Sequence, residues 1–184
     1  VKTAHLDGAF YYPKYGIGTI FEKMRDVCGI EYFHLNNRIT KIHHSNNRIQ
    51  SVEINGVKRV AIHHVVSSLP ISIMVQLLDP PAPKELIELS HSLKFRNIIL
   101  IAFFINKESI NKNGSMYFPS KQYPFTRIYE PKNRSKWMAP KDKTSLIVEI
   151  PCQKNDAIWS QDEKELIKEI YKELIELSFF KDEE

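Results

Sequence analysis

The chain contains 184 residues, of which 42 % are hydrophobic and 11 % aromatic, so it can bury a core and is not a disordered chain. Its 26 basic and 22 acidic residues give a formal net charge of +4. Lys and Arg form no concentrated basic block, which excludes the pattern of a nucleic-acid-binding surface, so we expect no nucleic-acid partner.

The chain begins with a predicted glycine turn and helix. Gly16 and Gly18 permit a tight turn into a helix over 15–26, whose apolar residues recur at helical spacing. Cys28-Gly29 is typical of a helix C-terminus and should end it.

A β-meander is expected next. Turn signals at 45–47 and 55–56, both rich in Asn, are of the kind that connects hairpin strands. Short strands are expected at 31–35, 39–43, 48–54, 57–60 and 61–66. The last of these is apolar and β-branched, which predicts a strand buried in a sheet.

The second half mixes helices and strands. Pro70 should begin a helix over 71–78, because proline fits a first helical turn. The proline-rich segment 79–83 ends this helix and marks the boundary between two lobes, 1–80 and 81–184. Further elements are expected as a helix at 84–90, strands at 97–104, 116–119, 125–129 and 145–150, and a final helix with a Ser160–Glu163 capping box. The pattern predicts an α+β fold.

Cysteine usage and hydropathy bear on location. Cys28 and Cys152 lie far apart and in no Cys-x-x-Cys pair, which favours a reducing, cytoplasmic compartment. No run of about 18 apolar residues is present, so we expect no membrane span. Val1 is not a methionine and Glu184 follows directly on a helical pattern, so we expect both ends to lie inside a longer protein.

Arg127 is the charged residue with the clearest chemical interest. It lies in an apolar and aromatic strand, where a lone guanidinium is costly unless it is paired. One interpretation is a site that holds a phosphate or carboxylate through two parallel hydrogen bonds. The other is an ion pair with Glu130 or Glu149, or an exposed strand face.

Histidines, serines and aromatic residues are further candidates for functional sites. Neighbouring residues on a strand point to opposite faces, so the pairs His43-His44 and His63-His64 each offer at most one ligand, and we expect no metal site. Ser67 and Ser68 lack the Gly-x-Ser-x-Gly elbow of a hydrolase. Five aromatic residues could form either a stacking surface for a nucleotide or sugar or ordinary core and rim: Tyr117, Tyr123, Phe125, Trp137 and Trp159.

The order of short motifs carries a resemblance to a known superfamily. Phe10-Tyr11-Tyr12-Pro13 followed by Gly16-Ile17-Gly18 resembles the Tyr-Pro-x-Gly-Gly segment of phytoene desaturases and protoporphyrinogen oxidases. Those proteins continue with a helix, a Val-x-x-Ile strand, a second strand and an apolar strand ending in proline. Residues 39–42, 49–54 and 65–70 take those places, so the chain resembles the central part of a flavin-dependent amine oxidoreductase.

The second half is similar to the UDP-galactopyranose mutase branch of these proteins. Phe125–Lys132 is similar to the Phe-x-Arg-x-x-Glu-x-Lys strand of that branch, and residues 143–151 resemble the strand that follows it. Taken together with the first half, the motifs cover most of the chain in collinear order.

The resemblance implies FAD as the cofactor of the parent protein. Residues 1–80 would be a partial FAD-binding domain and 81–184 a substrate-binding lobe. The backbone of Ile39 would contact the adenine of FAD. A turn beside the cofactor would be formed by Ser67, Ser68, Leu69 and Pro70.

The resemblance also implies a substrate cavity. Gly16 and Gly18 would approach the flavin ring, although Ile17 separates the two glycines here. Tyr12, Arg127 and Tyr129 would bind the substrate, with Arg127 on its phosphate. No catalytic side chain is named, because the flavin supplies the hard chemistry in such proteins.

These implications predict a piece of a larger enzyme. The parent would be an FAD-dependent oxidoreductase, or a flavin-using mutase that acts on a nucleotide sugar in polysaccharide biosynthesis. The Gly-x-Gly-x-x-Gly region and a closing flavin segment lie outside this sequence, so we expect it to need the rest of the parent chain and to bind FAD weakly or not at all alone. The alternative is a non-enzymatic protein-interaction module. Substrate identity, and oxidase against desaturase against mutase, stay open.

Overall fold

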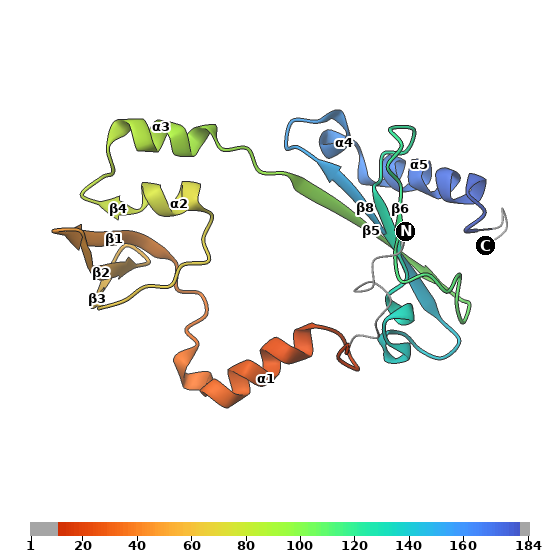
Figure 1. The fold of residues 1–184 in the computed structure, drawn as a ribbon, viewed down its shortest axis with the longest axis horizontal. Helices are drawn as coiled ribbons and strands as arrows, with labels where there is room; N and C mark the ends of the chain where they lie inside the picture. Colours follow the sequence, from red (N-terminus) through yellow and green to blue (C-terminus); the bar gives the residue numbers. More distant parts are fainter. Residues whose placement is uncertain (1–10, 181–184) are drawn as a thin grey trace, which may run out of the picture. The chain divides into compact units, whose positions relative to one another are not determined.

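The computed structural model describes residues 11–180, and these divide into two compact units, each with its own sheet (Figure 1). One unit is 29–95; the other joins 11–28 to 96–180. Both units combine helices with strands, which confirms the α+β class. The predicted functional boundary at residue 80 is not a boundary between these units and stays a prediction.

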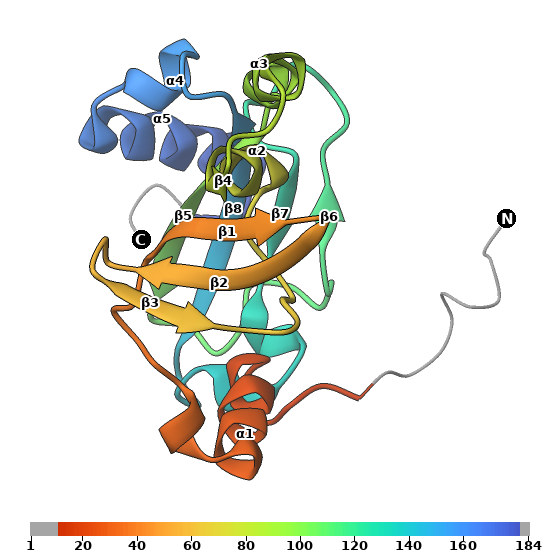
Figure 2. The same ribbon diagram turned by 90° about the vertical axis from the view of Figure 1, so that its left-hand side faces the viewer.

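The unit 29–95 contains the predicted meander. Strands β1 (Ile39–Ser45), β2 (Arg48–Ile54) and β3 (Lys58–Ala61) are antiparallel neighbours, and β4 (Leu78–Asp79) pairs in parallel with β1 (Figure 2). Positive φ angles at the turn residues Asn46 and Asn47 (50° and 59°), and at Asn55 and Gly56 (55° and 74°), confirm both predicted turns. The remaining elements of this unit are η2 (Ile30–Tyr32), α2 (Ile71–Gln76) and α3 (Lys84–Ser92).

Two predicted strands of this unit are wrong. Residues 31–35 form a 3-10 turn, η2, and extended chain instead of a strand. The apolar run 61–66 leaves the sheet after Ala61, with Ile62 donating one last hydrogen bond to the Gln50 carbonyl. Val66 is fully exposed. An apolar pattern shows that a segment favours burial, but it does not show that the segment pairs with a neighbouring strand, and residues 62–66 belong to no strand.

The second unit is built on a four-stranded antiparallel sheet with the order β5-β8-β7-β6. Its strands are β5 (Asn97–Ile105), β6 (Met116–Tyr117), β7 (Arg127–Tyr129) and β8 (Thr144–Cys152). Its helices and 3-10 turns are α1 (Gly18–Cys28), η3 (Pro131–Asn133), η4 (Lys136–Met138), α4 (Ala157–Ser160) and α5 (Glu163–Glu176). Within the described residues 11–180, no helix combines the length and apolarity needed to cross a membrane.

The core of the second unit lies between β8 and α5. Burial alternates strictly along β8, so that every second side chain faces the helix. Fully buried side chains from the sheet and from α5 form one cluster: Phe125, Ile128, Leu146, Val148, Ile150, Ile170 and Leu174. This alternation leaves the other side chains of β8 on the opposite face of the sheet.

The helix ends differ in detail from the prediction. Asp162, and not Ser160, caps α5, because its carboxylate accepts hydrogen bonds from the backbone N–H of Lys164 (3.0 Å) and Glu165 (3.2 Å). Ser160 instead ends α4. A carboxylate both accepts these bonds and opposes the positive end of the helix dipole, so it is well suited to this position. Gly29, with φ of 96°, ends α1 as predicted.

Candidate functional site

The face of the second sheet that points away from α5 gathers a mixed set of polar and apolar side chains. Directly paired residues on antiparallel strands share a face, so the register aligns Leu100, Glu149, Arg127 and Tyr117 in one row across all the strands. We call this side of the sheet the open face. It carries Ile98, Leu100, Phe104, Tyr117, Arg127, Tyr129, Ile147 and Glu149.

Arg127 and Glu149 form a two-pronged ion pair at the centre of this row. Arg127 Nε donates to Glu149 Oε2 at 2.8 Å, and Nη2 donates to Oε1. The side chains are 32 % and 14 % exposed, so the pair is screened from water without being sealed. Hydrogen bonds with Glu149 and Tyr117 raise the pKa of Arg127 above its ordinary value, and the guanidinium therefore stays charged.

Tyr129 connects this ion pair to a second cation. The guanidinium carbons of Arg127 and Arg134 lie 5.1 Å and 5.2 Å from the centre of the Tyr129 ring, within cation–π range. Arg134 also donates to the hydroxyl of Ser115 at 3.3 Å. With Glu149 as the carboxylate, the group of Arg127, Arg134 and Glu149 keeps an excess of positive charge, which favours an anionic ligand.

The other two charged residues of the Phe-x-Arg-x-x-Glu-x-Lys segment lie outside the open face and bind mainly backbone groups. Glu130 is fully buried and accepts hydrogen bonds from the Thr144 hydroxyl and from two backbone N–H groups of the loop after β5. Lys132 donates to backbone carbonyl oxygens. Of this segment's charged side chains, Arg127 alone lies on the open face.

The glycine turn belongs to the same unit as Arg127. Gly16 has φ of 97°, and a Cβ there would lie 3.1 Å from the sulfur of Met138, so both conformation and space favour glycine. Gly18 begins α1, and a Cβ there would meet nothing within 4 Å. Tyr12 is half-buried near the start of the described residues; Phe10 lies outside them.

The turn is attached to η4 through its neighbours. The Ser135 hydroxyl donates to the Lys14 carbonyl at 2.7 Å, and the Lys14 ammonium lies 3.9 Å from the centre of the Trp137 ring. The structure therefore brings Tyr12, Gly16 and Gly18 into one unit with Arg127 and Tyr129.

The remaining predicted cofactor residues belong to the unit 29–95. Ile39 begins β1, is half-buried and pairs with Ile54. The Ser67 hydroxyl accepts a hydrogen bond from the Leu69 N–H at 3.2 Å, which makes a tight turn immediately before α2. All four turn residues are exposed: Ser67, Ser68, Leu69 and Pro70. Their contact with FAD stays a prediction.

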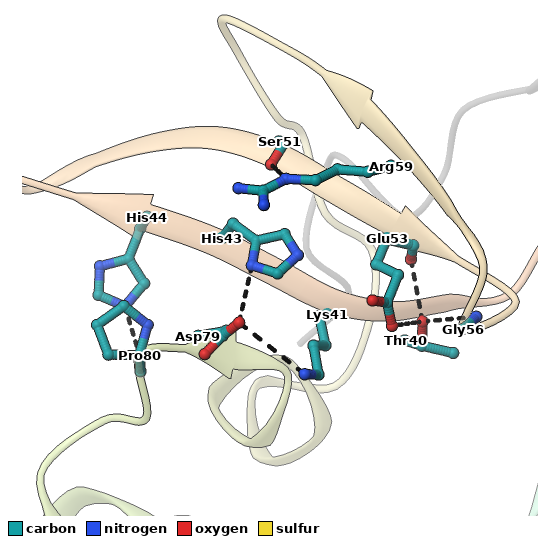
Figure 3. Close-up of polar contacts among 10 residues, drawn as sticks. All are labelled: Thr40, Lys41, His43, His44, Ser51, Glu53, Gly56, Arg59, Asp79 and Pro80. Carbon is teal, nitrogen blue, oxygen red and sulfur yellow. Dashed lines mark hydrogen bonds and ion pairs between the residues drawn. The ribbon is translucent and has the colours of Figure 1, made fainter.

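The histidines of β1 point to different partners, as Figure 3 shows. His43 Nδ1 lies 2.8 Å from the Asp79 carboxylate, which also faces Lys41 at 4.0 Å. His44 Nε2 lies 2.8 Å from the Pro80 carbonyl oxygen. Each of these two rings therefore has an ordinary protein partner.

The five aromatic residues separate into two groups. Phe125 is fully buried and stacks with Tyr123 at 5.4 Å between ring centres, so this pair belongs to the core. Tyr117, Trp137 and Trp159 are exposed, and Trp137 lines a pocket of about 480 Å³. The core interpretation is therefore right for Tyr123 and Phe125, and a stacking role for the three exposed residues stays a prediction.

Sequence reasoning missed Arg134, and it named Lys132 only as the last residue of the Phe-x-Arg-x-x-Glu-x-Lys segment, without a role. Arg134 lies in the stretch Lys-Asn-Arg-Ser-Lys, whose composition is that of a solvated surface, and its contact with Tyr129 depends on the turn that η3 makes. The only available signal was position: both residues follow closely on the strand that carries Arg127.

Comparisons with known proteins agree with the motif order. The family model of UDP-galactopyranose mutase matches residues 84–178, just over half of the chain. A crystal structure of reduced UDP-galactopyranose mutase has a TM-score of 0.80 and 16 % identity, over 94 % of this chain and 37 % of that one. A putrescine oxidase triple mutant has a TM-score of 0.63 and 17 % identity, over 82 % and 32 %.

A third solved structure widens the group. An oxidoreductase from Methanosarcina mazei has a TM-score of 0.67 and 17 % identity, over 91 % of this chain and 39 % of that one. A search of curated proteins found no match. The chain therefore has the fold of a central part of flavin-dependent amine oxidoreductases, and it spans just over a third of the mutase structure.

Proposed function

Because this chain belongs to the UDP-galactopyranose mutase family, we propose that it is the substrate-side part of a flavin-dependent enzyme that acts on a nucleotide sugar. The observation that carries the proposal is the open face, where Arg127 and Arg134 flank Tyr129. A nucleotide sugar brings a diphosphate, which paired guanidinium groups recognise well. Such an enzyme would act in the cytoplasm, in polysaccharide biosynthesis.

Arg127 would bind the diphosphate as a positioned donor. Its contact with Glu149 fixes the plane of the guanidinium and uses only one edge of it. A guanidinium carries more N–H donors than that pairing needs, so the remaining donors can reach a phosphate oxygen. Arg134 would add the positive charge that Glu149 cancels at Arg127.

The residues present are chemically suited to FAD. The segment 65–70 exposes apolar side chains beside the hydroxyls of Ser67 and Ser68, a combination that suits a flat ring system with polar edges. In the proposed enzyme, Ile39 and Ser67–Pro70 would hold the cofactor, and Gly16 would let its ring approach the backbone. The flavin, when bound, supplies the redox or nucleophilic chemistry.

An FAD-dependent oxidase of amines is the second candidate, since putrescine oxidase has the same fold. The charge of the open face separates the two. An amine substrate is a cation, and the excess of guanidinium over carboxylate around Tyr129 repels cations. A protein-interaction module would use the exposed apolar side chains of β5, such as Leu100 and Phe104.

Calorimetric titration of UDP into the 184-residue chain tests the proposal. We expect saturable binding that Arg127→Ala weakens about tenfold or more, because a charged hydrogen bond contributes about 1.5–3 kcal/mol. Arg48→Ala is the matched control, since it removes the same charge from the exposed start of β2. Absence of UDP binding, or equal binding by both variants, would contradict the nucleotide-sugar assignment.

Flavin binding is tested separately. Since the chain spans only 37 % of the mutase structure, we expect the purified chain to carry little or no FAD. Its absorbance between about 350 and 500 nm reports this directly. A stoichiometric flavin spectrum would show that these residues hold FAD without further protein.

A further inference from the structure

Lys132, in the short turn η3 that follows β7, has an unusual set of contacts for a lysine. Its ammonium nitrogen lies within hydrogen-bond distance of four backbone carbonyl oxygens, those of Glu108 (2.9 Å), Pro140 (2.9 Å), Lys141 (2.7 Å) and Lys143 (2.8 Å). An ammonium has three N–H bonds, which is fewer than these four carbonyl acceptors. The carbonyl oxygens therefore surround the charge as a shell does, and are not each paired with one hydrogen.

Glu130, two positions earlier, does the opposite. Its carboxylate accepts hydrogen bonds from the backbone N–H of Ile110 (3.2 Å) and Asn111 (3.1 Å), and from the Thr144 hydroxyl (2.6 Å). One short stretch of chain thus offers an anion to backbone N–H groups and a cation to backbone carbonyl groups. Both charges hold the loops after β5 and before β8.

The carbonyl shell lies in the wall of the pocket that Trp137 lines. Glu108, Pro140 and Lys141 supply both shell oxygens and pocket lining. Glu108 is far from Pro140 and Lys141 in sequence, and their carbonyl oxygens meet at the Lys132 nitrogen, so its charge helps to hold these pocket walls around the half-exposed indole.

We propose that Lys132 is a tethered monovalent cation, and that its carbonyl shell is a K⁺ or NH₄⁺ site filled by the protein's own ammonium. Potassium is the cation that proteins bind with backbone carbonyl shells, and its size is close to that of ammonium. Mg²⁺ and Ca²⁺ favour carboxylates at shorter distances. A planar guanidinium does not match the shell.

The test removes the tether and offers the free ion. Lys132→Met keeps an unbranched stem but removes the terminal ammonium and its charge, which leaves the shell unfilled; a Trp159→Phe background leaves Trp137 as the sole tryptophan. Melting temperature and Trp137 emission are followed in NH₄⁺, K⁺, Na⁺ and choline chlorides at equal ionic strength. We expect a lowered melting temperature that NH₄⁺ and K⁺ restore saturably and choline does not.

The control and a second measurement keep the proposal open to failure. Lys121→Met changes an exposed lysine of the same unit and should respond equally to every salt. Equal recovery of Lys132→Met by all the salts, or none in a folded variant, would overturn the proposal. If that variant does not fold, the Nζ–H signal of Lys132 in the ¹⁵N-labelled parent decides: slow exchange with water supports the shell, and exchange as fast as at Lys121 overturns it.

Discussion

The two sheets of this chain are covered to very different degrees. Along β8 every second residue is buried, and the side chains of the core between β8 and α5 are enclosed. In the unit 29–95, all of whose residues are described, Ile42 is the one buried hydrophobic side chain, and α2 buries none. Since burial contributes about 25 cal/mol per Å² of apolar surface, the sheet that contains β8 gains more stability from its buried side chains than the sheet of the unit 29–95 does.

The two regions also differ in whether their apolar side chains are buried. Around β8 they form the core and leave Arg127 and Tyr129 on the open face. In 29–95 they stay exposed, at Leu35, Val57 and Val66 among others. A hydrophobic pattern indicates that a segment favours burial, and only the fold shows whether the chain buries it.

The largest loss of stability is expected from a cavity in the core between β8 and α5. Ile170→Ala removes a fully buried side chain of α5 and should cost about 3 kcal/mol of unfolding free energy, since it leaves a cavity. Ile167→Ala, on the same helix but 43 % exposed, should cost less than about 1 kcal/mol. Denaturant unfolding followed by circular dichroism measures both. Equal losses would mean that α5 does not cover the sheet as described.

The next effect concerns the ion pair on the open face. Glu149→Gln leaves the Arg127 guanidinium half-buried without its countercharge and should cost about 1–2 kcal/mol. Glu169→Gln makes the same change on the exposed side of α5 and should cost nearly nothing. A loss no greater than that of the control would show that water already screens the pair.

The pH dependence of this pair follows from the sign of the Arg127 shift. Its pKa in the folded protein is raised above the ordinary arginine value, so its contribution to stability is complete below that ordinary value and is lost only as the pH rises through the raised pKa. The difference in stability between the parent and Glu149→Gln should therefore stay constant from neutral pH to about pH 10. A decline across that range would place the titrating group elsewhere.

A smaller effect tests which residue begins α5. Asp162→Ala removes the side chain that accepts from the N–H groups of Lys164 and Glu165, and should cost about 1 kcal/mol. Ser160→Ala should leave the melting temperature unchanged. The reverse result would restore the capping box that the sequence suggested.

The smallest effect is expected in the uncovered sheet. Asp79→Asn weakens the contacts of β4 with His43 and Lys41, but Asp79 is 42 % exposed, so the loss should stay below about 0.5 kcal/mol (Figure 3). Hydrogen exchange of the β1 amides provides the measurement. A loss as large as that of Ile170→Ala would mean that 29–95 is stabilised as strongly as the β8 sheet.

Features that depend on neighbouring residues in the sequence were predicted correctly. The Asn turns of the meander, the stop at Gly29, and the long strands β5 and β8 each depend on nearby residues, and the structure confirms them. The strand over 61–66 was wrong because a strand requires a partner that a sequence window does not contain. Ser160 was predicted as the cap because it precedes Glu163 at the spacing of a capping box, and only the geometry shows that Asp162 takes that place.

The candidate site divides in the same way. Arg127 stood out because a guanidinium is costly in an apolar strand, and the ion pair with Glu149 was one of its foreseen explanations. The contacts of Arg134 and Lys132 were not predicted, because their partners, a tyrosine ring and backbone carbonyl groups, leave no charge pattern in the sequence.

The short register of β7 on β8 has a consequence for insertions and deletions. Arg127, Ile128 and Tyr129 alternate between the open face and the core, and Glu130 is enclosed immediately afterwards. Removing one residue just before Arg127 would exchange the two faces, placing the guanidinium opposite Ile150 on the core face and Ile128 opposite Glu149 on the open face. The spacing of this segment is thus as strict a requirement as its residue types, and length changes there should be far less tolerated than substitutions.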